Sequence, residues 1–304
     1  MKLPWCVRAA LIAPVSACCL AVGVEGQDVE PRFLAQAPTG TDLVSLAYLH
    51  SWGAVLYDKT LPAENVDGTT HTFVAGYARF FSLFGVTARV DGALPFGTGD
   101  WTGLAAGVDT SRTATGLGDP FARLAVFFVG APAQSAGEFR EHSHDDTVVG
   151  AAIRVRAPLG QYDSSKLINL GSNRWMFSPR LGVAQPLGRF VLEGYASGWF
   201  FTDNTEFFGM NTVSQHPLLA IQLHVTYVIR PAFWIALSTR QSFGGATSVN
   251  GAEAANPQTS NRVGLTLALP VSTRGRIRVA ATTGLSTSVG NDYNTVAAAW
   301  SWFF

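Results

Sequence analysis

Cysteine is nearly absent from this chain and is confined to its beginning. The three cysteines are Cys6, Cys18 and Cys19. Residues 1–26 combine a basic start, an apolar run and a small-residue cleavage site, which is the pattern of a secretory signal peptide. Its removal leaves residues 27–304 without cysteine, which excludes a disulfide framework and thiol chemistry. The mature chain, residues 27–304, is therefore expected to form one domain without disulfides.

A second interpretation of the leader stays open. Val15-Ser16-Ala17-Cys18 resembles a lipoprotein signal, in which Cys18 would be acylated. That cleavage would leave the apolar residues 19–24 at the mature N-terminus, which is unusual.

Charge and long apolar runs are also scarce. Charged residues make up 14% of the chain, against about 25% in soluble domains, while hydrophobic residues make up 47%. No run after the leader reaches the roughly 18 apolar residues of a membrane-spanning helix. High hydrophobicity without helical spans indicates a barrel, where apolar residues occupy every second position. The net charge of zero gives no sign of a nucleic-acid partner.

Period-two alternation is clearest between Arg174 and Phe201. Trp175, Phe177 and Leu181 share one parity, and polar or small residues fill the other. This is the mark of a β-strand with two different faces. A Pro-Gly turn then leads into a second alternating arm. Each arm has about ten residues, the length that a tilted strand needs to cross a bilayer.

The same pattern predicts an all-β fold, a transmembrane antiparallel β-barrel of about 12 strands. Short connections alternate with long ones, as in outer-membrane barrels, which places both termini on the periplasmic side. The expected strands span residues 43–57, 72–81, 86–94, 121–129, 147–157, 174–185, 189–201, 218–229, 233–243, 262–269, 276–285 and 295–304.

Four segments between these strands carry particular expectations. Residues 27–41 are interpreted as a periplasmic lead-in, and residues 58–70 and 95–118 as loops. Residues 130–146 form a long connection at a position where the alternation of short and long connections predicts a short periplasmic turn. This segment is either an unusual periplasmic insert or a sign that the strand count is wrong by a pair. For residues 158–173 the sequence allows an inward constriction or an extracellular loop, and it favours the loop.

The last strand carries the sharpest local signal. Trp300, Trp302 and Phe304 share one parity, and Phe304 is the C-terminal residue. A final strand of this kind is typical of outer-membrane proteins and predicts recognition by the barrel-assembly machinery. The alternative is a soluble β-sandwich or lipocalin-like barrel. That alternative needs a second layer over the apolar faces, and no segment with helical periodicity supplies one.

Several short strings occur together: GLGDP at 116–120, GAPA at 130–133, APLGQYD at 157–163, NLGSNRW at 169–175 and FTDN at 201–204. In combination they resemble the bacterial outer-membrane family named for the meta-cleavage pathway of phenol degradation. The resemblance covers nearly all of the mature chain. It implies an outer-membrane barrel that passes hydrophobic or aromatic compounds, and it brings no catalytic residues.

Arginine on the polar parity of the strands is the main candidate constellation. An arginine that faces lipid at the bilayer midplane costs about 2–4 kcal/mol, so these side chains are expected to face the lumen. The set comprises Arg79, Arg89, Arg123, Arg154, Arg156, Arg180, Arg189, Arg240, Arg262, Arg276 and Arg278.

Two interpretations of these arginines stay open. A basic pore would favour anions, because guanidinium groups bind carboxylates in a bidentate manner. Alternatively the arginines pair with Asp91, Glu193 and loop carboxylates and simply fill a narrow barrel. The predicted pore-lining residues are Arg89, Arg123, Arg154, Arg156, Arg180, Glu193, His224, Arg240, Arg262 and Arg278.

Other chemistry has weaker support. The segment 141–146, EHSHDD, has metal-ligand residue types, but adjacent loop residues seldom close a tetrahedral site. His224 is either a ligand, a titratable gate or an interior hydrogen-bonder. Some barrels are phospholipases with Ser and His on the outer wall, yet His50 and His224 are the only histidines on expected strands, and neither has a serine partner. We therefore expect no enzyme activity, no metal and no cofactor.

The sequence favours an outer-membrane channel for small solutes, aromatic or hydrophobic and possibly anionic in character. The alternative is a non-transporting structural or adhesive barrel. The expected partners are a small-molecule solute, outer-membrane lipid and the assembly machinery, and the oligomeric state is not predicted.

Deletion of Phe304 should sharply lower the amount of protein in the outer membrane. The terminal strand must close the barrel, because an unpaired strand edge in lipid leaves backbone groups unsatisfied. The measurement is the quantity of protein in purified outer membranes. Unchanged levels would show that Phe304 is not an assembly signal.

Overall fold

The computed structural model describes residues 29–56, 63–105, 107–141, 145–253, 257–288 and 290–304. The predicted signal peptide with Cys18, and His142–His144 of the EHSHDD segment, lie outside the described residues.

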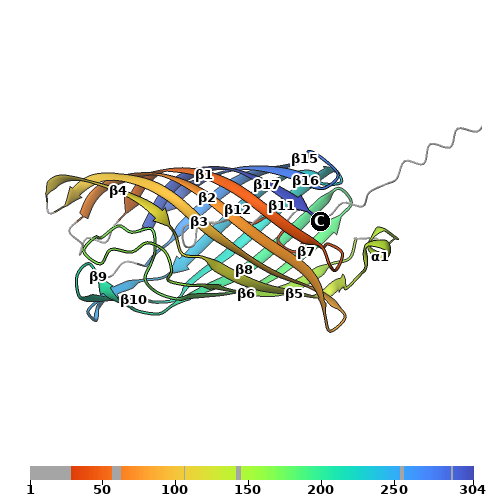
Figure 1. Cartoon of the computed structure of the whole chain (residues 1–304), viewed down its shortest axis with the longest axis horizontal. Coiled ribbons are helices and arrows are strands. Elements are labelled where there is room, and N and C mark those ends of the chain that lie inside the picture. The colour runs from red at the N-terminus through yellow and green to blue at the C-terminus, as the bar shows by residue number, and fades with distance from the viewer. Residues whose placement is uncertain (1–28, 57–62, 106, 142–144, 254–256, 289) are drawn as a thin grey trace, which may run out of the picture.

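Seventeen strands and one short helix make up the described chain (Figure 1). The elements are β1 (Asp42–Leu56), β2 (Ala63–Leu83), β3 (Val86–Ala105), β4 (Val108–Leu117), β5 (Phe121–Pro132), α1 (Ala136–Glu141), β6 (Val148–Arg156), β7 (Met176–Leu187), β8 (Phe190–Phe201), β9 (Asn204–Phe207), β10 (Asn211–Gln215), β11 (Leu218–Arg230), β12 (Phe233–Gly244), β13 (Thr247–Val249), β14 (Ala252–Glu253), β15 (Ser260–Pro270), β16 (Gly275–Thr287) and β17 (Gly290–Phe303).

Twelve of the strands form a closed antiparallel ring, as the sequence predicts. Each pairs with the next in the order β1, β2, β3, β5, β6, β7, β8, β11, β12, β15, β16 and β17, and β17 returns to β1. The closure is completed at the C-terminus, where Asp42 and Phe304 exchange backbone hydrogen bonds of 2.9 and 3.0 Å. A closed ring leaves no strand edge exposed to lipid.

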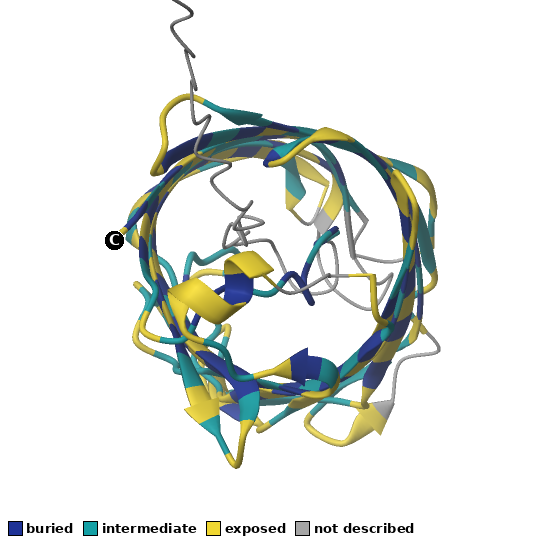
Figure 2. Cartoon of the chain, turned by 90° about the vertical axis from the view of Figure 1, so that its right-hand side faces the viewer, coloured by how far each residue is buried: buried dark blue, intermediate teal, exposed yellow. Residues whose placement is uncertain are grey.

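Alternation along each strand separates the two faces of the wall. In β7, Met176, Ser178 and Arg180 are buried, and Phe177 and Leu181 are exposed. The view along the barrel shows the same alternation of buried and exposed residues around the whole ring (Figure 2). Apolar residues therefore face outward and polar residues inward, which is the opposite of a soluble barrel.

The outer face carries the aromatic residues of the last strand. Trp300 and Trp302 point outward with ring centroids 6.0 Å apart, whereas Phe303 is buried with Leu43 and Ala78. No helix in the described part of the chain is both long enough and apolar enough to span a membrane.

The two ends of the barrel differ in their connections. The C-terminus, α1 and the turns β2–β3, β7–β8, β11–β12 and β15–β16 lie at one end, which we call the short-turn end (Figure 1). The opposite, long-loop end carries β4 and a separate four-stranded sheet of β9, β10, β13 and β14. These small strands occupy parts of residues 202–216 and 244–260, where only loops were expected.

Two predicted loops near the long-loop end are in fact strands. β2 begins at Ala63, and β3 continues to Ala105 and forms a hairpin with β4. The sequence prediction was wrong there because the outward positions of these segments are polar, for example Thr98 and Asp100. Outside the lipid layer the outer face of a strand contacts water and need not be apolar. The strands therefore continue to pair there without the alternation of apolar and polar residues that marks their membrane-spanning part.

The long connection at 130–146 is an insert, and the strand count is correct. It contains α1, which lies over the barrel opening at the short-turn end (Figure 2). Ser135 caps this helix: the Glu138 amide donates to Ser135 Oγ, and the Ser135 amide donates to Glu138 Oε2 at 2.8 Å. This reciprocal capping box explains a single helical turn that has no helical periodicity.

Residues 29–41 lie inside the barrel, so their interpretation as a periplasmic lead-in was wrong. Phe33, Leu34 and Ala37 are almost completely buried against residues of the inner wall. The segment enters at the short-turn end, where the Gly40 amide donates to the carbonyl of Phe80 at 2.8 Å. We call residues 29–41 the plug.

A protease-cleavable tag between Asn250 and Asn256 should be cut on intact cells, and one at residues 272–274 should not. The first site is at the long-loop end and the second is in the β15–β16 turn, and outer-membrane barrels place their longer loops outside. Cleavage is read on blots before and after cell lysis. The reverse pattern would contradict the predicted orientation.

Candidate functional site in the barrel lumen

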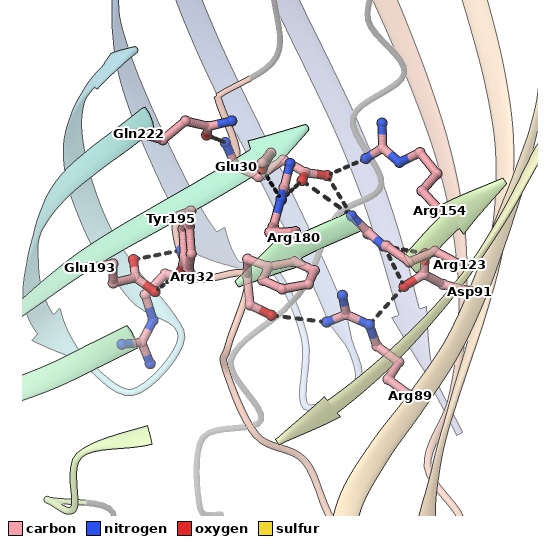
Figure 3. A network of polar contacts seen from close by, with 12 residues as sticks. Glu30, Arg32, Arg89, Asp91, Arg123, Arg154, Arg180, Glu193, Tyr195 and Gln222 are labelled. Atoms are coloured by element: carbon pink, nitrogen blue, oxygen red, sulfur yellow. Dashed lines mark hydrogen bonds and ion pairs between the residues drawn. The ribbon is translucent and has the colours of Figure 1, made fainter. Parts of the chain in front are cut away.

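Glu30 of the plug is the centre of the lumen network (Figure 3). Its Oε1 accepts hydrogen bonds of 3.1 Å from Arg123 of β5 and from Arg154 of β6, and its Oε2 accepts one from Arg180 of β7. The Glu30 amide donates to Gln222 Oε1 of β11 at 3.3 Å. One residue of the plug therefore joins four strands of the wall. Charge-assisted bonds of this kind are the strong ones in a buried site.

Asp91 extends the network toward the short-turn end. It accepts hydrogen bonds from Arg89 Nε at 2.8 Å and from Arg123 Nε at 2.9 Å, and its side chain is fully buried. Arg89 also donates to the carbonyl oxygen of Phe33 at 3.2 Å. The guanidinium groups thus hold both the side chains and the backbone of the plug (Figure 3).

The Phe33 ring lies among the same arginines. Its centroid is 5.0 Å from the guanidinium carbon of Arg89 and 4.9 Å from those of Arg123 and Arg180. Tyr195 and Phe127 contact the ring edge-on, at 5.6 and 6.5 Å. Cations close to an aromatic ring are attracted by its quadrupole, most strongly when they are desolvated.

Glu193 of β8 also contacts the plug. It accepts a hydrogen bond from the Arg32 amide at 2.7 Å and one from the Tyr195 hydroxyl at 2.6 Å. The carboxylate that contacts both Arg154 and Arg180 is Glu30 of the plug, which the sequence did not include among their expected partners.

The other predicted lumen residues lie where the parity placed them. Arg240 approaches the Trp199 ring at 4.7 Å, Arg278 approaches Trp234 at 5.2 Å, and Arg262 donates to the carbonyl of Tyr293. All three arginines are buried.

His224 is a buried hydrogen-bonder. Its Nδ1 lies 2.8 Å from Ser238 Oγ, and its ring is 5.2 Å from that of Tyr195. Of the roles that the sequence left open, the contacts support the interior hydrogen-bonder.

Two arginines of the wider set do not face the lumen. Arg79 points outward, 53% exposed, and pairs with Asp42 at 3.3 Å. Arg189 is exposed in the β7–β8 turn and donates to the Tyr227 hydroxyl at 3.4 Å. Both lie near the short-turn end, where an outward arginine costs only about 0–1 kcal/mol because water and headgroups are close.

Sequence reasoning missed Glu30, Arg32 and Phe33. The available signal was an imbalance of charge: the polar parity held many arginines and only Asp91 and Glu193 as acids. Buried cations are paired in folded proteins. The missing carboxylate had to come from a segment outside the strands, and Glu30 precedes the first of them.

A second group of arginines lies near the long-loop end. Arg156 ends β6, and Arg174 lies just before β7. Arg174 donates to Gln215 Oε1 at 2.5 Å and sits 4.4 Å from the Phe201 ring. Burial lowers the pKa of Arg174 to about 10. The side chain therefore remains charged at neutral pH, at the long-loop entrance to the barrel.

The loop 157–175 folds inward at this entrance. Ile168 and Leu170 pack against Trp101, Val66 and Ala114. Of the two arrangements that the sequence allowed, the structure has the inward one.

Asp119 anchors this loop. It accepts hydrogen bonds from the amides of Gly160 and Ser172 at 2.9 and 2.8 Å, and from the Ser172 hydroxyl at 2.6 Å. A Cβ on Gly160 would lie 2.7 Å from the Gly118 carbonyl carbon, and one on Gly171 would lie 2.7 Å from that of Gly160. Three of the short strings noted in the sequence thus meet at one point.

No group of three His, Cys, Asp or Glu residues in the described part of the chain could hold a metal ion. One histidine has a serine partner, contrary to the sequence expectation: His224 Nδ1 lies 2.8 Å from Ser238 Oγ in the barrel interior. His71, which falls between the expected loop 58–70 and the expected strand 72–81, lies directly opposite His50 on the outer wall, and the Tyr48 hydroxyl is 2.7 Å from His71 Nδ1.

A closed ring, an apolar exterior and a charged interior define a transmembrane β-barrel of the bacterial outer membrane. The chain belongs to the family described as "Putative MetA-pathway of phenol degradation", which matches residues 56–302.

Solved structures show the same fold. An outer membrane channel from Pseudomonas putida F1 is similar with a TM-score of 0.78 and 18% identity, over 91% of this chain and 100% of that one. The β-domain of the Bordetella autotransporter BrkA has a TM-score of 0.50 and 11% identity, over 88% of this chain and 100% of that one. No curated protein sequence matches the chain.

Substitution of Glu30 by Gln should loosen the plug without opening the ring of strands. Removing one partner of a buried ion-pair cluster costs about 3–5 kcal/mol, and here the cost falls on the docking of residues 29–41. A cysteine at the buried position Ala35 reports the change, since the mature chain is expected to hold no other thiol. We expect Glu30→Gln to raise the rate of thiol modification at least about tenfold.

The exposed Glu64→Gln is the matched control and should leave that rate unchanged. Equal rates in all three proteins would show that Glu30 does not hold the plug.

Proposed function

We propose that this protein is an outer-membrane channel for small solutes, closed in the present conformation by the plug. The single observation that carries the proposal is the bond between Glu30 and three arginines of the wall. A barrel that served only as a structural element could fill its lumen with wall side chains. Here residues 29–41 fill the lumen. They precede β1 in the chain and do not belong to the strands of the wall.

The lining of the lumen supports small anionic and aromatic solutes. Guanidinium groups and aromatic rings alternate along the inner wall, with Arg174 beside Phe201 and Arg240 beside Trp199. A ring of cations in a pore attracts anions, and aromatic faces suit planar apolar groups. The solute would enter past Arg174 and pass the Glu30 network once the plug has moved.

The proposed role is transport without catalysis. Family membership and the channel of similar fold support such a role, and no group of three His, Cys, Asp or Glu residues among the described ones could hold a metal ion.

A second candidate is a non-transporting structural or adhesive barrel. The observation that favours it is the same plug, because Phe33 and Leu34 fill the lumen almost without exposure. The two candidates differ in whether the plug leaves.

Conductance across a planar bilayer separates them. We expect wild-type protein to be mostly closed, because the plug is docked, and Glu30→Gln to conduct in discrete steps.

Reversal potentials across a salt gradient should show a preference for anions that high salt weakens. Arg154→Gln combined with Arg156→Gln should reduce this preference without unfolding the barrel, which heat-modified migration on gels would verify.

Silence of both the wild type and Glu30→Gln would favour the non-transporting barrel. A cation preference in the open Glu30→Gln pore would contradict the assignment of the lumen arginines as its selectivity determinants.

A further inference from the structure

The plug presents two different chemical groups to the same arginines. Arg123 bonds the Glu30 carboxylate at 3.1 Å and lies 4.9 Å from the centroid of the Phe33 ring. Arg180 likewise bonds Glu30 and lies 4.9 Å from the Phe33 ring. Two shared guanidinium groups therefore hold a carboxylate and a phenyl ring side by side.

We propose that Glu30 and Phe33 occupy a binding site for a small aromatic carboxylate, and that such a solute opens the channel by competing with them. The inference rests on the proposed transport function and adds the class of solute and the means of opening. In this structure the carboxylate and the ring that the wall binds belong to Glu30 and Phe33, three residues apart in the chain. A free molecule that carries both groups can replace them.

The shape of the ring site supports an aromatic group. Phe127 and Tyr195 meet the Phe33 ring at interplanar angles of 72° and 86°, so a planar ring is held edge-on from two sides. The Arg180 Nε is fixed by Ser197 Oγ at 3.0 Å, and that bond orients its guanidinium toward the lumen. A site with fixed donors and ring contacts needs little rearrangement to receive a ligand.

The carboxylate is needed as well as the ring. If the plug left without a replacement anion, the buried guanidiniums of Arg123, Arg154 and Arg180 would lose the countercharge of Glu30. A neutral aromatic molecule cannot supply that charge, and a short aliphatic acid cannot fill the ring site. Sites that hold buried polar groups reject ligands that leave those groups unpaired.

Competition makes an unusual prediction about affinity. While the plug is docked, only the small fraction of molecules with an undocked plug can bind the solute, so the apparent affinity is reduced by that fraction. Weakening the plug should therefore strengthen binding, because the site is then free in a larger fraction of the molecules. Phe33→Ala is the sharper variant, because it leaves every charged group in place.

Binding is measured by calorimetry on the whole barrel in detergent, with phenylacetate as the probe. We expect Phe33→Ala to bind phenylacetate at least tenfold more tightly than wild type does. The matched control, Phe208→Ala in an exposed loop, should bind as wild type does. Adding Arg180→Gln to Phe33→Ala should abolish binding. If Phe33→Ala does not migrate as a folded barrel, Glu30→Gln takes its place.

The chemical controls use the Ala35→Cys protein and its thiol modification rate. Saturating phenylacetate should raise the rate at least tenfold, because it expels the plug. Acetate lacks the ring and benzyl alcohol lacks the charge, so each should change the rate less than twofold.

Absence of phenylacetate binding to both Phe33→Ala and Glu30→Gln would overturn the inference, as would equal effects of acetate or benzyl alcohol. Those results leave the channel function intact if Glu30→Gln conducts. Binding and plug release without conductance would instead remove the transport function and keep the site.

Discussion

The structure depends on the need to neutralise arginine inside a barrel. The strands must turn their polar parity inward, and on this chain that parity is rich in arginine, so guanidinium groups from β3, β5, β6 and β7 meet in a confined space. Buried charges that lack partners are costly. Asp91 pairs with Arg89 and Arg123 from within the wall, and Glu30 of the plug shares Arg123 and adds Arg154 and Arg180. The position of residues 29–41 inside the lumen follows from this requirement.

The strands themselves were predictable because two independent patterns agree. Alternation in β7, β8 and β11 comes from lipid on one side and water on the other, and the lengths of the connections fix their order. The same pattern failed where lipid ends. At the long-loop end, β3 continues to pair with β2 and β4 although the outer faces of these strands are polar. No alternation of apolar and polar residues marks these parts of the strands in the sequence. The lumen arginines were correct by parity, except near the short turns, where Arg79 and Arg189 reach water outside.

The plug could not be derived from any pattern, because its contacts are distant in sequence and specific to single residues. Glu30 is separated from Arg180 by 150 positions. A segment without strand or helical periodicity gives no sign of which face it shows. The strings around Asp119 illustrate the same limit. Singly, the strings GLGDP, APLGQYD and NLGSNRW predict nothing. In the fold they meet where β3 changes its pairing from β4 to β5, and the loop 157–175 packs its backbone against that point.

The plug also bears on the order in which the molecule can be completed. Residues 29–41 are made before any strand, yet Glu30 contacts β5, β6, β7 and β11, and Glu193 of β8 receives the Arg32 amide. These strands come together only when the sheet has curved around on itself. The plug is synthesised before the strands that bind it, so it has nowhere to dock until more than half of the circumference exists. Docking of the plug is then a late event, and it occurs only in a barrel whose inner wall has been assembled correctly.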